Sequence, residues 1–274
     1  MNRADIIKQI KTKKSFLCIG LDTSIQKIPK HLLKLDDPVY EFNKQIIDAT
    51  HDLAVAYKPN IAFYEVNGAK GWTSLEKTIN YINGTYPQVF TIADAKRGDI
   101  GNTSLQYALA FLSNLDFDAI TVAPYMGKDS IAPFLSIEGK WIILLALTSN
   151  KGSDDFQMLG LKKDGVLYKQ VLQTASSWGD INNIMFVVGA TKAEVLGEIR
   201  KIIPEHFLLV PGVGAQGGSL SEVVRYGMNK DCGLLVNASR SIIYASEDED
   251  FCDRARHEAL KLQKEMASYL DKIH

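Results

Sequence analysis

Short runs of consecutive apolar residues recur along the chain, and a longer amphipathic segment follows each of them. The runs are rich in Val, Ile, Leu and Ala, which is typical of strands buried on both faces, and the segments between them have helical spacing. The predicted strands are Phe16–Asp22, Leu53–Lys58, Val89–Asp94, Ala119–Pro124, Trp141–Leu147, Ile184–Gly189, Phe207–Pro211 and Gly233–Asn237. The predicted helices are Val39–Asp52, Ser74–Asn83, Ser104–Leu115, Lys128–Ile137, Lys163–Trp178, Lys192–Ile203, Ser219–Met228 and Glu249–Ile273.

Eight alternating strand and helix units predict an α/β fold, the (β/α)8 or TIM barrel, because eight such units close a parallel sheet on itself. A doubly wound open sheet is the alternative. An amphipathic segment at about residues 3–13 precedes the first strand and is expected to cap one end of the barrel. No linker, low-complexity segment or charge block interrupts the chain, so we expect residues 1–274 to form one domain.

Polar residues follow nearly every predicted strand, at the end of the barrel where active sites of this fold lie. A core would not accept so many polar groups without partners or a function. These strand-end residues are Asp22, Lys58, Asp94, Lys96, Pro124-Tyr125, Thr148-Ser149-Asn150, Gly189-Ala190-Thr191, Pro211-Gly212-Val213-Gly214 and Asn237-Ala238-Ser239-Arg240.

The third strand ends in alternating charges. Residues two apart in a strand point to the same side, so Asp94 and Lys96 are expected on one face, whereas Asp99 needs a turn at Gly98 to join them. With Lys58 they would form a network in which carboxylates keep both lysines protonated. Such charges suit stabilisation of a carbanion followed by protonation, as in a decarboxylation, whereas a Schiff-base lysine must be neutral. An ordinary strand-end salt bridge is the alternative.

The loop Gly212–Gly217 matches the glycine pattern of dinucleotide-binding sites. That use requires an acidic residue at the end of the next strand, which here ends at Asn237. We therefore expect a phosphate site after strands 7 and 8, next to Pro211. Its glycines would let backbone N–H groups approach a phosphate, and Arg240 would supply a guanidinium; these glycines are Gly212, Gly214, Gly217 and Gly218. Turn glycines and a surface arginine are the alternative.

Charge and cysteine content narrow the possible partners. The chain has 31 Lys and Arg against 32 Asp and Glu, which predicts a small-molecule substrate and no binding to nucleic acid or membrane. No run has the length of a membrane span, and the N-terminus lacks the apolar core of a signal peptide. Three scattered cysteines suggest a cytoplasmic protein, and neither they nor the five histidines show the spacing of metal ligands.

Five segments together resemble orotidine 5′-phosphate decarboxylases, in particular the longer bacterial, type 2 subgroup, over essentially the whole chain. They are Asp94–Ile100, Asp22, Lys58-Pro59-Asn60, Pro211–Gly218 and Asn237–Arg240. The resemblance implies cofactor-independent decarboxylation of orotidine 5′-monophosphate to UMP and CO2, the last step of de novo UMP biosynthesis.

The resemblance also implies roles for individual residues. Lys96 would protonate C6 of the pyrimidine, with Lys58 and Asp94 completing the charged network. Asp22 would hold the ribose together with Lys58, and Ser149 would read the amide edge of the pyrimidine.

Arg240 and the loop around Gln216 match the family's phosphate grip. The family is a homodimer, so Asp99 and Thr103 would complete the partner's site. The segment Ile25–Asp37 matches no part of the family to which we can assign a task.

Two other functions fit part of the sequence. Metal-dependent relatives on the same barrel, such as Mg-dependent sugar-phosphate lyases or decarboxylases, share the D-x-K-x-x-D strand but need further carboxylates. Glu65 is the one nearby acidic candidate for such a ligand, and it lies well past the end of the second strand. The other possibility is a barrel that binds a nucleotide phosphate without catalysing a reaction.

Overall fold

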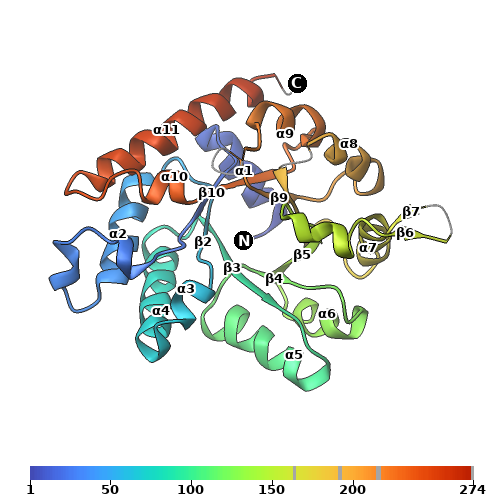
Figure 1. The fold of residues 1–274 in the computed structure, drawn as a ribbon, viewed down its shortest axis with the longest axis horizontal. Helices are drawn as coiled ribbons and strands as arrows, with labels where there is room; N and C mark the ends of the chain where they lie inside the picture. Colours follow the sequence, from blue (N-terminus) through green and yellow to red (C-terminus); the bar gives the residue numbers. More distant parts are fainter. Residues whose placement is uncertain (163–164, 191–192, 214–216, 273–274) are drawn as a thin grey trace.

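The computed structural model describes residues 1–162, 165–190, 193–213 and 217–272. Eight parallel strands close into a barrel in the order β1-β10-β9-β8-β5-β4-β3-β2, which confirms the predicted (β/α)8 fold (Figure 1). The barrel strands are β1 (Leu17–Gly20), β2 (Ala56–Lys58), β3 (Phe90–Arg97), β4 (Ala119–Val122), β5 (Trp141–Leu147), β8 (Ile184–Val188), β9 (Leu208–Pro211) and β10 (Leu234–Ala238). A separate antiparallel pair consists of β6 (Gly160–Leu161) and β7 (Gly165–Val166).

Helices surround the barrel in chain order (Figure 1). The longer ones are α1 (Arg3–Lys13), α2 (Pro38–Thr50), α4 (Gly68–Thr85), α5 (Gly101–Ala108), α6 (Lys128–Leu135), α7 (Leu167–Ala175), α8 (Ala193–Ile202), α9 (Leu220–Gly227) and α11 (Phe251–Leu270). The short ones are α3 (Ala62–Glu65), α10 (Arg240–Ile243), the 3-10 turns η1 (Ile25–Lys27), η2 (Leu32–Lys34) and η4 (Lys151–Asp155), and the π-helical η3 (Leu109–Asn114). None of the described helices is long and apolar enough to cross a membrane.

The strands are buried because helices cover their outer face and side chains fill the barrel. Every residue of β1, β2, β4, β8 and β10 is buried, as the continuous apolar runs predicted. Lys58, Thr121 and Asn237 are polar exceptions within these strands, and each lies at or next to the carboxyl end of its strand. The polar residues of these five strands are therefore buried where a site can form.

The predicted helix Lys163–Trp178 was wrong at its start. Val166 has an extended backbone and pairs with Gly160, so β7 precedes α7, which begins at Leu167. Glycine disfavours a helical first turn, the β-branched Val166 favours extended structure, and the register with β6 fixes that choice.

The segment Ile25–Asp37 connects β1 to α2 through η1 and η2. Its last residue starts α2, because the Asp37 carboxylate accepts a hydrogen bond from Tyr40 N at 3.1 Å and caps the helix. The same carboxylate accepts from Ser74 Oγ at 2.7 Å and pairs with Lys77 at 3.0 Å, both on α4. This segment thus fixes α2 against α4.

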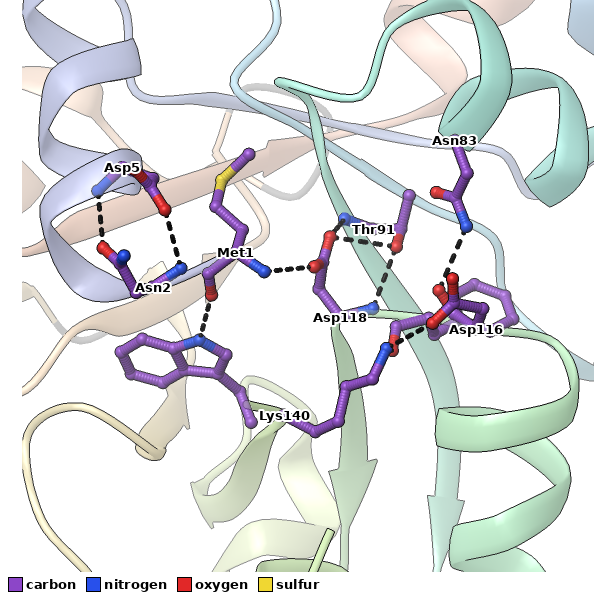
Figure 2. A network of polar contacts seen from close by, with 10 residues as sticks. Met1, Asn2, Asp5, Asn83, Thr91, Asp116, Asp118 and Lys140 are labelled. Carbon is purple, nitrogen blue, oxygen red and sulfur yellow. Dashed lines mark hydrogen bonds and ion pairs between the residues drawn. The ribbon is translucent and has the colours of Figure 1, made fainter. Parts of the chain in front are cut away.

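A polar network joins the chain's first residues to the amino-terminal ends of β3, β4 and β5 (Figure 2). Oδ1 of Asp118 lies 2.7 Å from the Met1 amino group, and Oδ2 accepts from Thr91 N at 3.0 Å and from Thr91 Oγ1 at 3.2 Å. The indole Nε1 of Trp141 donates to Met1 O at 2.9 Å. Arg3, in the first turn of α1, donates to Ile181 O at 3.3 Å, so α1 lies across the barrel end opposite the strand-end residues.

We expect Asp118→Asn to lower the free energy of unfolding by about 2 kcal/mol, because an amide group would face a donor where a carboxylate oxygen now accepts. Asp116→Asn is the matched control, since its carboxylate is exposed and pairs with Lys140 at the surface. The control should cost less than about 1 kcal/mol. Urea denaturation at pH 7 measures both values, and equal losses would contradict the assignment.

Candidate active site

β3 carries the central charged residues and is irregular where they lie. Its register against β4 shifts between Ala93 and Arg97. Within this bulge Lys96 has φ 49°, a left-handed conformation that a residue with a side chain adopts only at a cost. The side chains of Asp94 and Lys96 do meet, but through this irregularity rather than through the regular alternation that the sequence suggested.

Asp94 lies between two ammonium groups. Its Oδ2 is 2.8 Å from Lys58 Nζ and its Oδ1 is 2.5 Å from Lys96 Nζ. Thr121 Oγ1 donates to the same Oδ1 at 3.1 Å. The side chains of Lys58 and Asp94 are only 6% and 11% exposed, whereas that of Lys96 is 50% exposed. The network therefore has a buried half and a half that can reach a ligand.

Lys58 and Asp94 each stabilise the ionised form of the other. Burial by itself would raise the pKa of Asp94, but Lys58 and Lys96 hold that pKa well below its usual range. Burial would lower the pKa of Lys58, yet the carboxylates of Asp94 and Asp22 raise it above its ordinary value. Both groups are therefore charged at neutral pH, as the sequence predicted for this lysine.

A cavity of about 160 Å³ opens beside this network at the carboxyl ends of the strands. Six residues predicted for the site line it: Asp22, Lys58, Asp94, Pro211, Gly212 and Arg240. Oδ1 of Asp22 is buried and, within the described part of the chain, has no hydrogen-bond partner. A buried carboxylate oxygen without a donor is costly, so this atom is suited to accept a hydrogen bond from a ligand.

Asp22 is held through its backbone. Tyr244 Oη donates to Asp22 O at 2.9 Å and accepts from Ser24 N at 2.7 Å. Leu21 N donates to Lys58 O at 3.0 Å, which joins the ends of β1 and β2. The side chain of Asp22 is thereby placed beside Lys58 while its Oδ1 stays available.

The phosphate side of the cavity comes from the ends of β9 and β10. Gly212 has φ 98°, and Gly218 N donates to Gly212 O at 3.1 Å, so the chain after β9 turns back on itself. A Cβ on Gly218 would come within 2.9 Å of that oxygen. Arg240 begins α10 directly after β10 and lines the same cavity. The loop residue Gly217, with φ 86°, is not one of the lining residues.

The predicted contributions of Gly214 and Gln216 fall outside the described residues. Ser149 is described, and it follows β5 and lies against Gly189 after β8, where a Cβ would approach Ser149 Cα within 2.9 Å. Thr148 N next to it donates to Gln157 Oε1 at 2.7 Å, which ties this loop down. Ser149 is thus at the correct end of the barrel, although it does not line the cavity itself.

Asp99 and Thr103 do not line the cavity of their own chain either. Asp99 Oδ1 accepts from Ile100 N at 2.7 Å, and Thr103 is exposed in the first turn of α5. Ile100 between them is 58% exposed. These residues form a rim outside the cavity.

Three further polar residues line the cavity: Asn60, Asn237 and Ser239. Their position at or just beyond a strand end was visible in the sequence, but no individual role was predicted for any of them. Thr121 was missed because it lies inside the apolar run of β4, where one hydroxyl is a weak signal.

Glu65, the acidic residue considered as a metal ligand, forms an ion pair with Arg97. The guanidinium of Arg97 lies over the rings of Tyr107 and Phe111, at 5.5 and 5.6 Å from their centroids. Glu65 does not line the cavity. Over the described ranges, no three His, Cys, Asp or Glu residues are grouped so that they could hold a metal ion.

We expect Asp94→Asn to lower the free energy of unfolding at pH 7 by about 3 kcal/mol, because the Lys58 ammonium would remain buried without its partner. Lys96→Met is the control and should cost less than about 1 kcal/mol, since that ammonium is half exposed. The Asp94 pKa is depressed in the folded state, so this carboxylate stabilises the fold above its unfolded pKa of about 3.9 and loses that effect as pH falls below it. Denaturation at pH values between 7 and 3 should show the unfolding free energies of the wild type and Asp94→Asn approaching each other as the pH falls. A constant difference would contradict the role given to Asp94.

Comparison with known proteins gives one consistent result. The model of the family "Orotidine 5'-phosphate decarboxylase / HUMPS family" matches residues 15–254, which include all eight barrel strands. Orotidine 5′-phosphate decarboxylase of Flavobacterium johnsoniae is 63% identical over 271 residues, covering 99% of each chain. The protein of the same name from Bacteroides fragilis is 58% identical over 273 residues, covering 100% of each.

Solved structures agree with these relatives. The OMP decarboxylase of Leishmania donovani superposes with a TM-score of 0.82 at 34% identity, covering 98% of both chains. A structure from Toxoplasma gondii, titled as a putative orotidine-monophosphate decarboxylase, has a TM-score of 0.84 at 32% identity and covers 97% of this chain and 98% of its own. The likeness therefore extends over the whole barrel and includes the strand ends that form the cavity.

Proposed function

Because this chain belongs to the orotidine 5′-phosphate decarboxylase / HUMPS family, we infer that it is an orotidine 5′-phosphate decarboxylase, an enzyme of UMP biosynthesis that converts orotidine 5′-monophosphate to UMP and CO2. The observation that carries this conclusion is the Lys58–Asp94–Lys96 network beside a strand-end cavity that Asp22 and Arg240 also line. The reaction needs a cation where negative charge develops and a proton donor at the same point, and Lys96 can supply both.

In the proposed reaction, the bond between C6 and the carboxylate breaks and its electron pair stays on C6 while CO2 leaves. The Lys96 ammonium stabilises that charge and then donates a proton to form the C6–H bond of UMP. Asp94 holds the Lys96 ammonium through an ion pair, and Lys58 holds Asp94 from the buried side. Lys96 regains its proton from water, which its exposure allows.

Binding residues would surround this centre. Oδ1 of Asp22 accepts from a ribose hydroxyl, to which Lys58 also donates. Arg240 and the backbone beside Pro211, Gly212 and Gly217 bind the phosphate. Ser149 reads the amide edge of the pyrimidine, and Gln216 contributes to the phosphate loop. Contacts to the phosphate are remote from C6, so their binding energy can help to close the site around the reacting atoms. The proposal includes no cofactor and no metal.

We propose that the site is completed by a second copy of the chain. Asp99 and Thr103 lie outside the cavity of their own chain, at a rim that also exposes Ile100. In a homodimer with twofold symmetry, each copy would offer this rim to the other's cavity. A single domain over residues 1–274 and a location in the cytoplasm remain predictions, the latter resting on three free cysteines.

Decarboxylation of orotidine 5′-monophosphate, followed by its change in ultraviolet absorbance in the presence of EDTA, tests the function. We expect rapid turnover by the wild type and a loss of at least about 1,000-fold in Lys96→Ala, which lacks the proton donor. Lys169→Ala, which removes a surface lysine on α7, is the control and should keep full activity. A wild type that is inactive here but acts on a sugar phosphate after Mg²⁺ is added would replace this function with the metal-dependent alternative. Tight binding of UMP without CO2 release would indicate a binding protein.

Mixing two inactive variants tests the shared site. In a hybrid of Lys96→Ala with Asp99→Ala, one of the two sites has both an intact Lys96 and an intact Asp99. An equal mixture that exchanges subunits at random should recover about a quarter of the wild-type activity, because half of the dimers are hybrids with one intact site each. Mixtures that stay inactive although subunits exchange would place Asp99 in its own chain's site.

A further inference from the structure

One hydroxyl group connects the two central residues of the site. Thr121 is 1% exposed in β4, and its Oγ1 donates to Asp94 Oδ1 at 3.1 Å while accepting from Lys96 N at 2.9 Å. We propose that Thr121 is a positioning residue that sets the place of the Lys96 ammonium for proton transfer, an inference that rests on the proposed function.

The bulge in β3 explains why a side chain is needed at this point. Ala93 pairs with Ile120 and Arg97 pairs with Val122, so Thr121 is the one β4 residue between these two pairs. On β3, three residues lie in the same interval. A regular ladder would give the Lys96 N–H a carbonyl partner on the neighbouring strand, and in the bulge the Thr121 hydroxyl takes that place.

The backbone of Lys96 needs this support because its φ of 49° is a left-handed conformation that is unfavourable for a residue with a side chain. The left-handed backbone sets the direction in which the side chain leaves β3. With the hydroxyl removed, the N–H would lose this acceptor, and a relaxed backbone would move Nζ away from its present position.

Thr121 also fixes the partner of that ammonium. Oδ1 of Asp94 accepts from both Thr121 Oγ1 and Lys96 Nζ. The hydroxyl therefore limits rotation of the Asp94 carboxylate group about its side-chain bonds. The Lys58 contact uses the other oxygen, Oδ2, and does not depend on Thr121. Loss of the hydroxyl should therefore disturb the proton donor more than the groups proposed to bind ribose and phosphate.

Thr121→Val tests this role because it keeps the shape of the side chain and removes the hydroxyl. We expect kcat to fall about 10- to 100-fold, the range that small misplacements of a reacting group produce, while KM changes less than about 3-fold. Thr121→Ser keeps the hydroxyl and should stay within about 3-fold of the wild-type kcat. Thr121→Cys has a side chain of similar size whose thiol is a weaker donor and acceptor, so its kcat should be intermediate. This variant supplies the test if the valine variant does not fold.

Thr91→Val is the matched control. Thr91 is also fully buried, lies on the adjacent strand β3, and its hydroxyl both donates to and accepts from Asp118. That pair lies beside Met1, where β3 and β4 begin (Figure 2), so Thr91→Val should lower the unfolding temperature as Thr121→Val does and leave kcat unchanged.

Equal kcat losses in the two valine variants, a change confined to KM, or a serine variant as slow as the valine one would overturn the proposal. A wild type that releases no CO2 from orotidine 5′-monophosphate would instead overturn the proposed function. An active wild type with an equally active Thr121→Val would reject only the role of Thr121.

Discussion

The attraction between the buried Lys58 ammonium and the Asp94 carboxylate is the interaction on which the site depends. Neither charge could be held in that position alone, because each is almost fully removed from water. Lys58 uses one oxygen of Asp94, which leaves the other for Lys96 and Thr121. The pair therefore provides a fixed negative charge at the barrel mouth, and the half-exposed Lys96 ammonium is placed against it.

Carboxylates at the two ends of the barrel differ in whether their oxygens have hydrogen-bond partners within the protein. At the amino-terminal end, Asp118 uses both oxygens within the protein, through Met1 and Thr91. At the carboxyl end, Asp22 keeps Oδ1 without a hydrogen-bond partner among the described residues. Satisfied polar groups add stability, whereas an unsatisfied buried oxygen lowers stability until a ligand binds it. This contrast places stability at one end and ligand binding at the other, as is general for this fold.

The same contrast explains why the bulge in β3 is accepted. A regular strand would pair the Lys96 N–H with β4 and give up the geometry that brings Lys96 of β3 and Thr121 of β4 onto one carboxylate oxygen of Asp94. The irregular strand costs backbone energy and leaves the pairing incomplete, and the Thr121 hydroxyl restores one hydrogen bond. Local strain and its local compensation both lie within the active site.

Local sequence was sufficient for the barrel and for much of the site. Continuous apolar runs specify buried parallel strands, and the carboxyl ends of such strands meet at one end of the barrel. For this reason the grouping of Asp22, Lys58, Asp94 and Arg240 could be predicted from strand ends alone. The hydrophobic pattern gave a wrong helix start at Val166, where the local sequence does not distinguish helix from strand. The pairing of Val166 with Gly160 decides its conformation.

The sequence by itself determined which charges end the strands, because hydrophobic periodicity is a local property of the chain. Only the tertiary structure decided how they meet. The contact between Asp94 and Lys96 depends on a register shift against another strand, and Thr121 joins them from a position that looks like ordinary apolar core. The tertiary structure also places Asp99 and Thr103 outside the cavity of their own chain. Such relations depend on distances between segments far apart in sequence, which no local pattern encodes.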